Sequence, residues 1–246
     1  MPTDKAGQII YPVDNGEPLA NDTEHLDWIT FLKNGLDDYF VGRNDVFVAA
    51  DLLWYPVKDR PDVSKAPDVM VVLNHPAGPR MSYKQWEEND RPPQVVFEFM
   101  SSSNTAGEMM DKLDFYSEAG CEEFYIFDYQ RDTLRAYLRE TPGKPLVKTG
   151  PDSKGFWHSP LLDLTFGLDA QGDLWVLRPD GKLMETQREI WARAEAERLR
   201  AEAESIRAET ERLRAEKERL RAESEGLRAN KLAAKLRELG IDPDSI

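Results

Sequence analysis

The chain has 246 residues, of which 46 are acidic and 32 basic, so its formal net charge is −14. A hydrophobic content of 40% with 10% aromatics excludes a fully disordered chain, and no apolar run approaches the roughly 20 residues that cross a bilayer. A single cysteine, Cys121, excludes an internal disulfide framework and a cysteine-rich zinc module. Because the first residues lack the pattern of a secretion signal, we expect a cytoplasmic protein with no membrane segment.

Charge is distributed unevenly along the chain. Residues 188–238 hold 14 basic and 12 acidic side chains, which leaves 18 basic and 34 acidic side chains, a net of −16, for the remainder. Nearly all aromatic, proline and glycine residues also precede position 185. We therefore expect four segments. They are an N-terminal arm (1–20), one folded domain (21–184), a long helix (185–240) and a short tail (241–246).

The first half of the expected domain reads as one helix followed by three strands. Asp22 or Thr23 can cap a helix along which apolar residues recur at helical spacing as far as Tyr39. Three apolar runs, typical of strands buried on both faces, follow at 46–55, 66–74 and 94–100. The irregular segment 74–93 is expected to be a long loop or to contain a short helix.

The second half begins with a helix whose two ends are marked in the sequence. Thr105 and Glu108 fit a capping box, and Gly120 fits the left-handed position that ends a helix. A strand is predicted at 122–128, with TLRAYLRE as its hairpin partner and further strands at the periphery. Strand, helix and strand in this order predict a crossover in a mixed sheet, so the fold class is α/β.

From about residue 185 the sequence repeats every seven residues. The motif RLRAE recurs with a large apolar residue in register at five positions, namely Leu199, Ile206, Leu213, Leu220 and Leu227. This period is typical of a coiled coil. The second seam position is weak, because it holds Ala203, Thr210, Lys217 and Ser224. We expect a long charged helix that forms a homo-oligomer or binds a partner helix.

Three ionisable residues lie where secondary-structure propensity alone would not place them. Asp68 follows a proline at the start of an apolar strand, and Glu98 lies inside VVFEFM. An unpaired buried carboxylate costs several kcal/mol, so Glu98 needs a cation, a metal ion or a proton. Alternation puts Glu98 on the same strand face as Val96 and Met100, and if the following helix covers that face, its Lys112 can approach Glu98.

These residues have the chemistry of a metal-dependent hydrolase. Two carboxylates on neighbouring strands form a hard oxygen site for Mg²⁺ or Mn²⁺. Such a metal ion activates water and neutralises charge on a phosphate, and a nearby lysine can orient the nucleophile or stabilise the transition state. Asp68 and Glu98 are thus candidate metal ligands, and Lys112 is a candidate catalytic cation for phosphodiester hydrolysis.

Each of these residues also has a structural interpretation. Asp68 can cap a turn, Lys112 can extend along the helix surface to water, and a structural ion pair with Lys112 explains Glu98 equally well. Asp51 is expected to be a polar strand residue, although it could also contact the metal ligands without binding the metal ion itself. His25 is expected to be structural.

The runs PDVMVV, VVFEFMSSSN and KLDFYSEAGCEEFYIFD resemble the Uma-two family of restriction endonuclease-like proteins, a branch of the PD-(D/E)XK nuclease superfamily. The resemblance covers roughly residues 20–180. It implies a restriction-endonuclease-like mixed β-sheet core flanked by helices. It also implies that Asp68 and Glu98 bind the metal ion, with the backbone carbonyl of Phe99 as a third ligand.

One position departs from the superfamily pattern. The lysine expected two residues after the glutamate is Met100 here. The Uma-two branch is thought to supply a lysine from the following helix instead, and Lys112 matches that role by analogy. The heptad segment lies outside the resemblance.

The leading hypothesis is therefore a Mg²⁺-dependent endonuclease that acts on DNA. A net charge of −16 opposes it, because DNA affinity comes largely from phosphate neutralisation by Lys and Arg, and the nearby basic residues are scattered. They are Lys58, Arg60, Lys65, Arg80 and Lys84. The alternatives are a catalytically silent interaction or scaffold protein, and an enzyme for a small phosphorylated substrate that uses the same site.

Overall fold

The computed structural model describes residues 9–14, 16, 18–101 and 103–240, so part of the predicted arm and the whole of the predicted tail lie outside the described residues. Contacts divide the chain into two compact units between Gln187 and Arg188. None of the α-helices in the described part of the chain combines the length and apolar composition that a membrane span requires.

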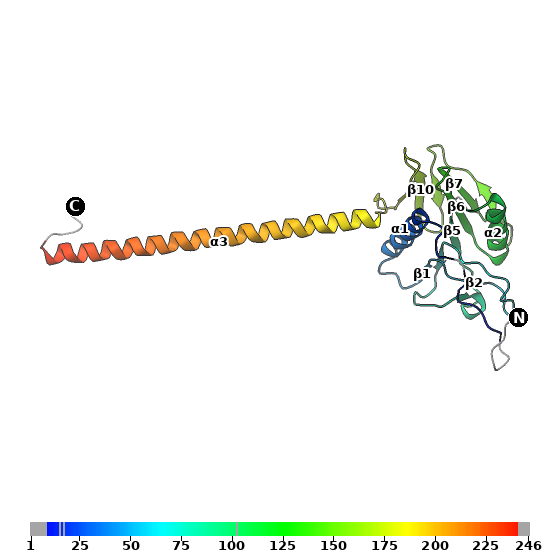
Figure 1. Cartoon of the computed structure of the whole chain (residues 1–246), viewed down its shortest axis with the longest axis horizontal. Helices are drawn as coiled ribbons and strands as arrows, with labels where there is room; N and C mark the ends of the chain where they lie inside the picture. The colour runs from blue at the N-terminus through cyan, green and yellow to red at the C-terminus, as the bar shows by residue number, and fades with distance from the viewer. Residues whose placement is uncertain (1–8, 15, 17, 102, 241–246) are drawn as a thin grey trace. The chain divides into compact units, whose positions relative to one another are not determined.

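A six-stranded mixed sheet forms the centre of the first unit (Figure 1). Its strands lie in the spatial order β1 (Val46–Ala49), β3 (Val69–Leu73), β5 (Val95–Met100), β6 (Glu123–Asp128), β7 (Thr133–Leu138) and β8 (Val147–Thr149). Strands β5 and β6 are parallel, and the other neighbouring pairs are antiparallel. Helix α2 (Ala106–Ala119) connects the parallel pair, so the predicted α/β fold class and crossover are confirmed.

Helix α2 begins and ends where its sequence signals predict. The Thr105 side chain accepts a hydrogen bond from the backbone N–H of Glu108, and the Glu108 carboxylate accepts one from the N–H of Thr105, which completes a capping box. Gly120 ends the helix at φ 104°, and a Cβ there would lie 3.0 Å from Pro92. The left-handed backbone favours glycine at this position.

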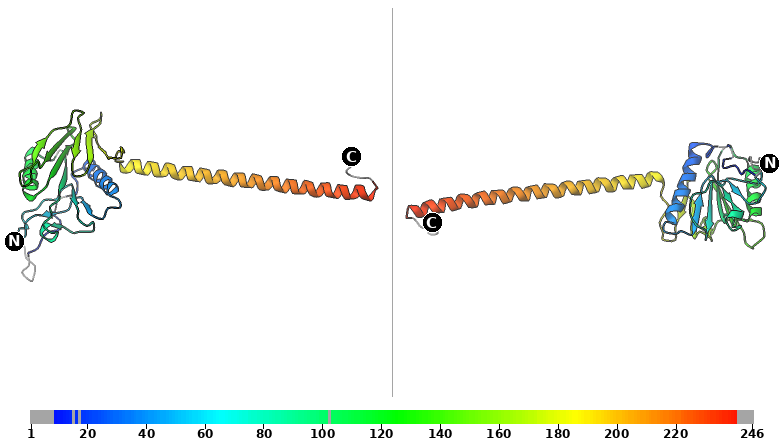
Figure 2. Two further views of the ribbon diagram at one scale, coloured as in Figure 1. Left: turned by 180° about the vertical axis from the view of Figure 1, so that it is seen from behind. Right: turned by 90° about the horizontal axis from the view of Figure 1, so that it is seen from below.

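Two layers cover the central sheet. Helix α1 (Thr23–Tyr39) lies on one face and α2 on the other, as the right-hand view of Figure 2 shows. The α1 face is also packed by a three-stranded sheet of β9 (Trp157–Ser159), β10 (Leu164–Leu168) and β11 (Leu174–Leu177). The α2 face is packed by the parallel pair β2 (Trp54–Tyr55) and β4 (Tyr83–Lys84).

Side chains of β5 alternate between the two layers. Phe97 and Phe99 belong to the core on the α1 side, whereas Val96 and Met100 belong to the core on the α2 side. Because Glu98 shares the parity of Val96 and Met100, its carboxylate enters the layer beneath α2. This alternation puts an ionisable group inside an apolar layer.

Three segments differ from the sequence-based expectation. The run 46–55 is broken at Asp51, whose left-handed backbone (φ 49°) separates β1 from β2. The segment 74–93 contains the expected short helix as a 3₁₀ helix, η1 (Gln85–Glu87), but also the strand β4, which was not expected. The strands after residue 150 contribute the buried Phe166 and Val176 to the core, so they are not merely peripheral. Their apolar side chains cover a sheet face that α1 alone does not.

The second unit is dominated by one helix, α3 (Gln187–Glu238), which has 52 residues. At 1.5 Å per residue it is about 78 Å long. None of its residues is buried within the described chain. The long helix is present as expected from the heptads, while its self-association stays a prediction.

Candidate active site

The Glu98 carboxylate is held by two residues of α2. Lys112 Nζ donates a hydrogen bond to Oε2 at 2.6 Å, and the Tyr116 hydroxyl donates one to Oε1 at 2.5 Å. The Glu98 side chain is 0% exposed, whereas that of Lys112 is 21% exposed. Since Lys112 and Tyr116 lie four residues apart, they occupy the same face of α2. The structure thus brings Glu98 and Lys112 together, as strand alternation suggested.

Burial dominates the electrostatics of this carboxylate. Removal from water raises the pKa of Glu98 to about 7, opposed by the positive charge of Lys112 and reinforced by the negative charge of Asp68. Burial and the adjacent Glu98 also raise the pKa of the Tyr116 hydroxyl, which therefore stays a hydrogen-bond donor. Sequence reasoning did not identify Tyr116 as a partner of Glu98.

Asp68 lies just before β3, beside Glu98. The antiparallel register pairs Val69 with Phe97, so one step further Asp68 is opposite Glu98. Its Oδ2 atom accepts a hydrogen bond from the backbone N–H of Phe99 at 2.7 Å. Because β3 begins only at Val69, the N–H of Phe99 is bonded to the side chain of Asp68 and not to a backbone carbonyl of β3. Within the described residues, Oδ1 of Asp68 has no hydrogen-bond partner.

His25 orients the same carboxylate from α1. Its Nε2 lies 3.1 Å from Asp68 Oδ2, and its Nδ1 accepts a hydrogen bond from the backbone N–H of Asn21 at 3.1 Å. This pattern assigns the proton of the neutral ring to Nε2, which donates to Asp68. Burial alone would lower the pKa of His25, but the hydrogen bond and charge of Asp68, with the charges of Glu98 and Asp22, raise it. His25 was expected to be structural, and its lone place near a helix start gave no signal of this contact.

Asp68 and Lys112 open onto a cleft of about 440 Å³. The cleft is also lined by Phe99, the residue that follows Glu98 on β5. The ionisable side chains around it are mainly acidic: Asp51, Asp68, Glu108 and Asp111, against Lys65, Lys112 and His25. A cleft with this charge balance favours a cation.

Asp51 reaches the cleft because of its backbone. Its N–H donates to the carbonyl of Pro67 at 3.0 Å, which ties the end of β1 to the residue before Asp68. Aspartate tolerates the left-handed conformation better than most residues. The aspartate in AADLLWY was therefore the one sequence feature that could have indicated a bend at Asp51 in place of a continuous strand.

The donor set suits a hard divalent cation that keeps most of its water ligands. No group of three or more His, Cys, Asp or Glu side chains in the described part of the chain is arranged to hold a metal ion. Mg²⁺ commonly uses one or two carboxylates plus water, and Asp68 offers an oxygen at the cleft. The Glu98 side chain is 0% exposed and its oxygens face Lys112 and Tyr116, so Glu98 can act as a second ligand only if these contacts rearrange.

Met100 occupies the strand position at which the superfamily pattern has a lysine. Met100 is buried, and its Sδ lies 3.3 Å from Nη2 of Arg135, so no ammonium reaches Glu98 from that strand position. Lys112 reaches the carboxylate from α2 instead.

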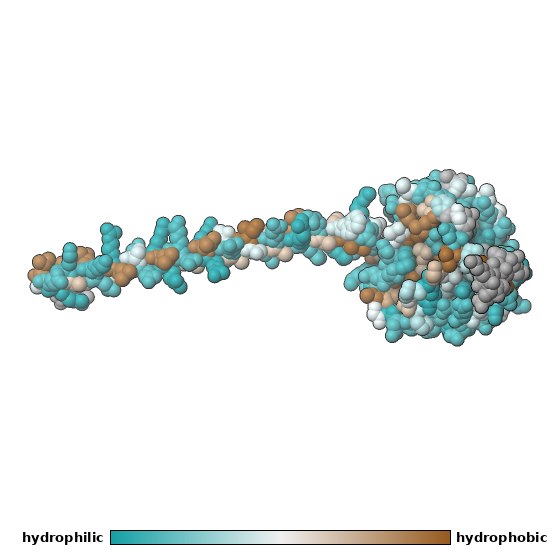
Figure 3. Space-filling model, turned by 60° about the horizontal axis from the view of Figure 1, so that its bottom comes forward, coloured by the Kyte–Doolittle hydropathy of each residue, from teal (hydrophilic) through white to brown (hydrophobic). Residues whose placement is uncertain are grey.

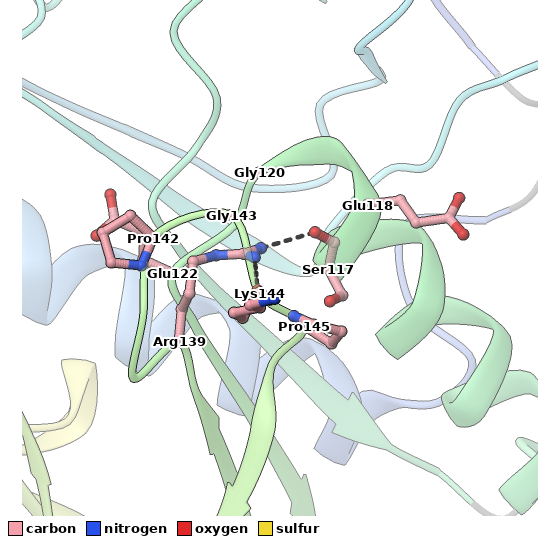
Figure 4. Close-up of a pocket in the computed structure, with 9 residues that line it drawn as sticks. All are labelled: Ser117, Glu118, Gly120, Glu122, Arg139, Pro142, Gly143, Lys144 and Pro145. Atoms are coloured by element: carbon pink, nitrogen blue, oxygen red, sulfur yellow. Dashed lines mark hydrogen bonds between the residues drawn. The ribbon is translucent and has the colours of Figure 1, made fainter.

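A second hollow, of about 590 Å³, lies at the carboxyl end of α2 (Figure 4). The guanidinium of Arg139 donates hydrogen bonds to the backbone carbonyls of Ser117 and Lys144, which Figure 4 marks, and also to that of Cys121. The arginine fastens the β7–β8 connection to the end of α2. The hollow lacks the carboxylate–lysine arrangement found around Glu98.

Comparison with known families identifies the chain. The sequence profile of Uma2, described as "Putative restriction endonuclease", matches residues 6–171, which is more than half of the chain. The chain belongs to the Uma2 family. The match contains Asp68, Glu98 and Lys112, and this membership supports a nuclease.

A solved structure is also similar to this Uma2 chain. It is the crystal structure of a "putative nuclease belonging to DUF820" from Anabaena variabilis ATCC 29413, with 13% sequence identity and a TM-score of 0.41. The similarity covers 58% of this chain and 75% of that chain. A search of curated proteins found no match.

Proposed function

We propose that this Uma2 protein is a divalent-metal-dependent endonuclease that hydrolyses phosphodiester bonds in DNA. The observation that carries the proposal is the buried Glu98 carboxylate bonded to Lys112, a residue that lines an acidic cleft together with Asp68. Buried ionisable groups with perturbed pKa values are typical of catalytic sites, and membership in a nuclease family supplies the class of reaction.

In this proposal, Asp68 and Glu98 hold Mg²⁺ or Mn²⁺, with the backbone carbonyl of Phe99 as a third oxygen. The metal ion, when bound, lowers the pKa of a water ligand and neutralises charge on the scissile phosphate. His25 acts as a positioning residue, because its Nε2–H fixes the orientation of Asp68. Tyr116 does the same for Glu98 through its hydroxyl.

Lys112 has two roles in this proposal. Its ammonium compensates the charge of Glu98 within the protein, and its exposed part lines the cleft where a phosphate would lie. A point charge there stabilises negative charge that develops on phosphate oxygens during hydrolysis.

The acidic cleft explains why a metal ion is central to the proposal. Among the basic residues near the site in sequence, Arg60, Arg80 and Lys84 form ion pairs with Asp62, Glu88 and Glu87 respectively, while Lys65 lines the cleft. Few protein cations therefore face the cleft, and DNA binding is expected to depend strongly on the bound metal ion.

Cleavage of plasmid and single-stranded DNA with Mg²⁺ or Mn²⁺ tests the proposal. The wild type is compared with Asp68→Asn, Glu98→Gln and Lys112→Met, each of which should lose at least about 100-fold in rate. Glu123→Gln is the matched control, because Glu123 is a buried carboxylate on the adjacent strand, bonded to Ser159 and Tyr125 outside the cleft. Equal cleavage by all variants would mean that these residues are not catalytic.

A scaffold function is the second candidate. It is favoured by the fact that Lys112 and Tyr116 already satisfy both oxygens of Glu98, as a purely structural ion pair would. Absence of cleavage in the wild type, with folding intact and no metal binding, would favour the scaffold. Metal-dependent hydrolysis of a small phosphate ester but not of DNA would favour the third interpretation.

A further inference from the structure

Helix α3 carries a stripe of large apolar side chains in water. They are 53% to 60% exposed and recur at every seventh position, as Leu199, Ile206, Leu213, Leu220 and Leu227. Figure 3 shows hydrophobic groups, in brown, separated by hydrophilic surface along this helix. A strict seven-residue period keeps such a stripe on one side of a helix only if the helix supercoils around another.

Charged residues flank the stripe with complete regularity. With the stripe at heptad position d, the next residue (position e) is always arginine: Arg200, Arg207, Arg214, Arg221 and Arg228. Three residues after each of the first four stripe residues (position g) the residue is always glutamate: Glu202, Glu209, Glu216 and Glu223. Within the described residues, none of these side chains forms an ion pair in its own chain.

This arrangement discriminates between the two orientations of a helix pair. In a parallel, in-register pair, each position g lies beside the position e that is five residues later in the other helix. Glu202 of one copy then meets Arg207 of the second copy, and the same contact recurs in the next three heptads on both sides of the seam. In an antiparallel pair, position g faces g and e faces e, so glutamates meet glutamates and arginines meet arginines.

We propose that α3 pairs with α3 of a second copy of the same chain as a parallel, in-register coiled coil. Position a is small or polar, so burial of apolar side chains at the seam does little to favour one relative direction of the two helices. The flanking charges select the partner and its direction. The occupant is a second copy because one helix carries both halves of every charge pair. A parallel coil tethers the two copies of the first unit at the same end of the coil. This inference does not depend on nuclease activity.

Light scattering of the 246-residue chain tests the pairing. The wild type should have twice the mass of one chain, and raising the salt concentration should weaken the dimer, because its ion pairs are exposed. Replacement of the four position-g glutamates by arginine should abolish the dimer, as should replacement of Arg207, Arg214, Arg221 and Arg228 by glutamate. Mixing the two variants should restore a one-to-one dimer. A monomeric wild type, or two variants that dimerise as well as the wild type, would overturn the proposal.

Disulfide cross-linking tests the direction. Ala196→Cys lies at position a near the start of the stripe, so in a parallel pair two copies meet and form a covalent dimer on oxidation. Ala201→Cys, at the outward position f, is the matched control and should not cross-link at the same rate. The native Cys121 is buried and does not compete. Equal cross-linking rates for the two variants, or no cross-link through position 196 in a dimeric protein, would refute the parallel arrangement.

Discussion

The ammonium of Lys112 lies 2.6 Å from Oε2 of Glu98, across the interface between α2 and the central sheet. The contact compensates a carboxylate that has no access to water. It also leaves the exposed part of Lys112 at the cleft that Asp68 lines. One pair therefore serves stability and, in the proposed function, catalysis. The predictions below separate the two contributions.

Lys112→Met should destabilise the protein at neutral pH by on the order of 1–3 kcal/mol, because Glu98 loses its cation and must take up a proton. The loss should be smaller at acidic pH, where Glu98 is already protonated in the folded protein. Urea denaturation at both pH values measures the effect. A penalty that does not change with pH would show that Lys112 does not compensate a charge on Glu98.

Tyr116→Phe should destabilise the protein by about 1–3 kcal/mol, since Oε1 of Glu98 loses its only hydrogen bond within the described residues. Tyr137→Phe is the matched control, because Tyr137 is buried in the same core layer and its hydroxyl has no partner in the described chain. The two variants are compared by denaturant unfolding. Similar losses would rule out a special role of the Tyr116 hydroxyl.

The pH dependence of the free energy of unfolding should reveal the titration of the Glu98 carboxyl group. Burial raises its pKa from the ordinary value of 4.5 to about 7, so the folded state holds the proton more tightly than the unfolded state. The stability contributed by protonation is fully present below pH 4.5 and is lost as the pH rises through about 7. Relative to Glu98→Gln, the wild type should therefore lose stability between these two pH values.

Unfolding curves across this range, followed by tryptophan fluorescence, make the comparison. Glu108→Gln is the control, because hydrogen bonds from Thr105 lower the pKa of Glu108 and move its titration below this range. If the wild type and Glu98→Gln had parallel stability profiles, Glu98 would not titrate as the structure implies.

Local signals in the sequence predicted much of the fold. The Thr105–Glu108 capping box and Gly120 set the ends of α2, because both depend on backbone groups only a few residues away. The alternation of apolar residues also placed Glu98 on the strand face of Val96 and Met100, and the structure shows that α2 covers this face. Capping and side-chain alternation are local properties, so one sequence suffices to predict them.

The rest depended on contacts between distant residues. His25 and Asp68 are 43 positions apart, and the Tyr116 hydroxyl reaches Glu98 only after α2 packs on the sheet. The bend at Asp51 and the sheet formed by β9, β10 and β11 likewise arise from tertiary packing. No short sequence pattern encodes these distances.

His25→Ala should weaken Mn²⁺ binding about 10- to 100-fold, because Asp68 loses the donor that fixes its orientation. His25→Gln retains a side-chain donor and should restore part of the affinity. Calorimetric titration of both variants gives the affinities, and circular dichroism checks that they are folded. If neither variant altered Mn²⁺ affinity, His25 would be a structural residue alone.

The most direct test of the proposed site is Mn²⁺ titration of the wild type, Asp68→Asn, Glu98→Gln and the control Glu123→Gln by calorimetry. The proposed function predicts binding to the wild type and the control, and loss of binding in both site variants. The same affinity in all four proteins, or no binding to a folded wild type, would contradict a metal site formed by Asp68 and Glu98.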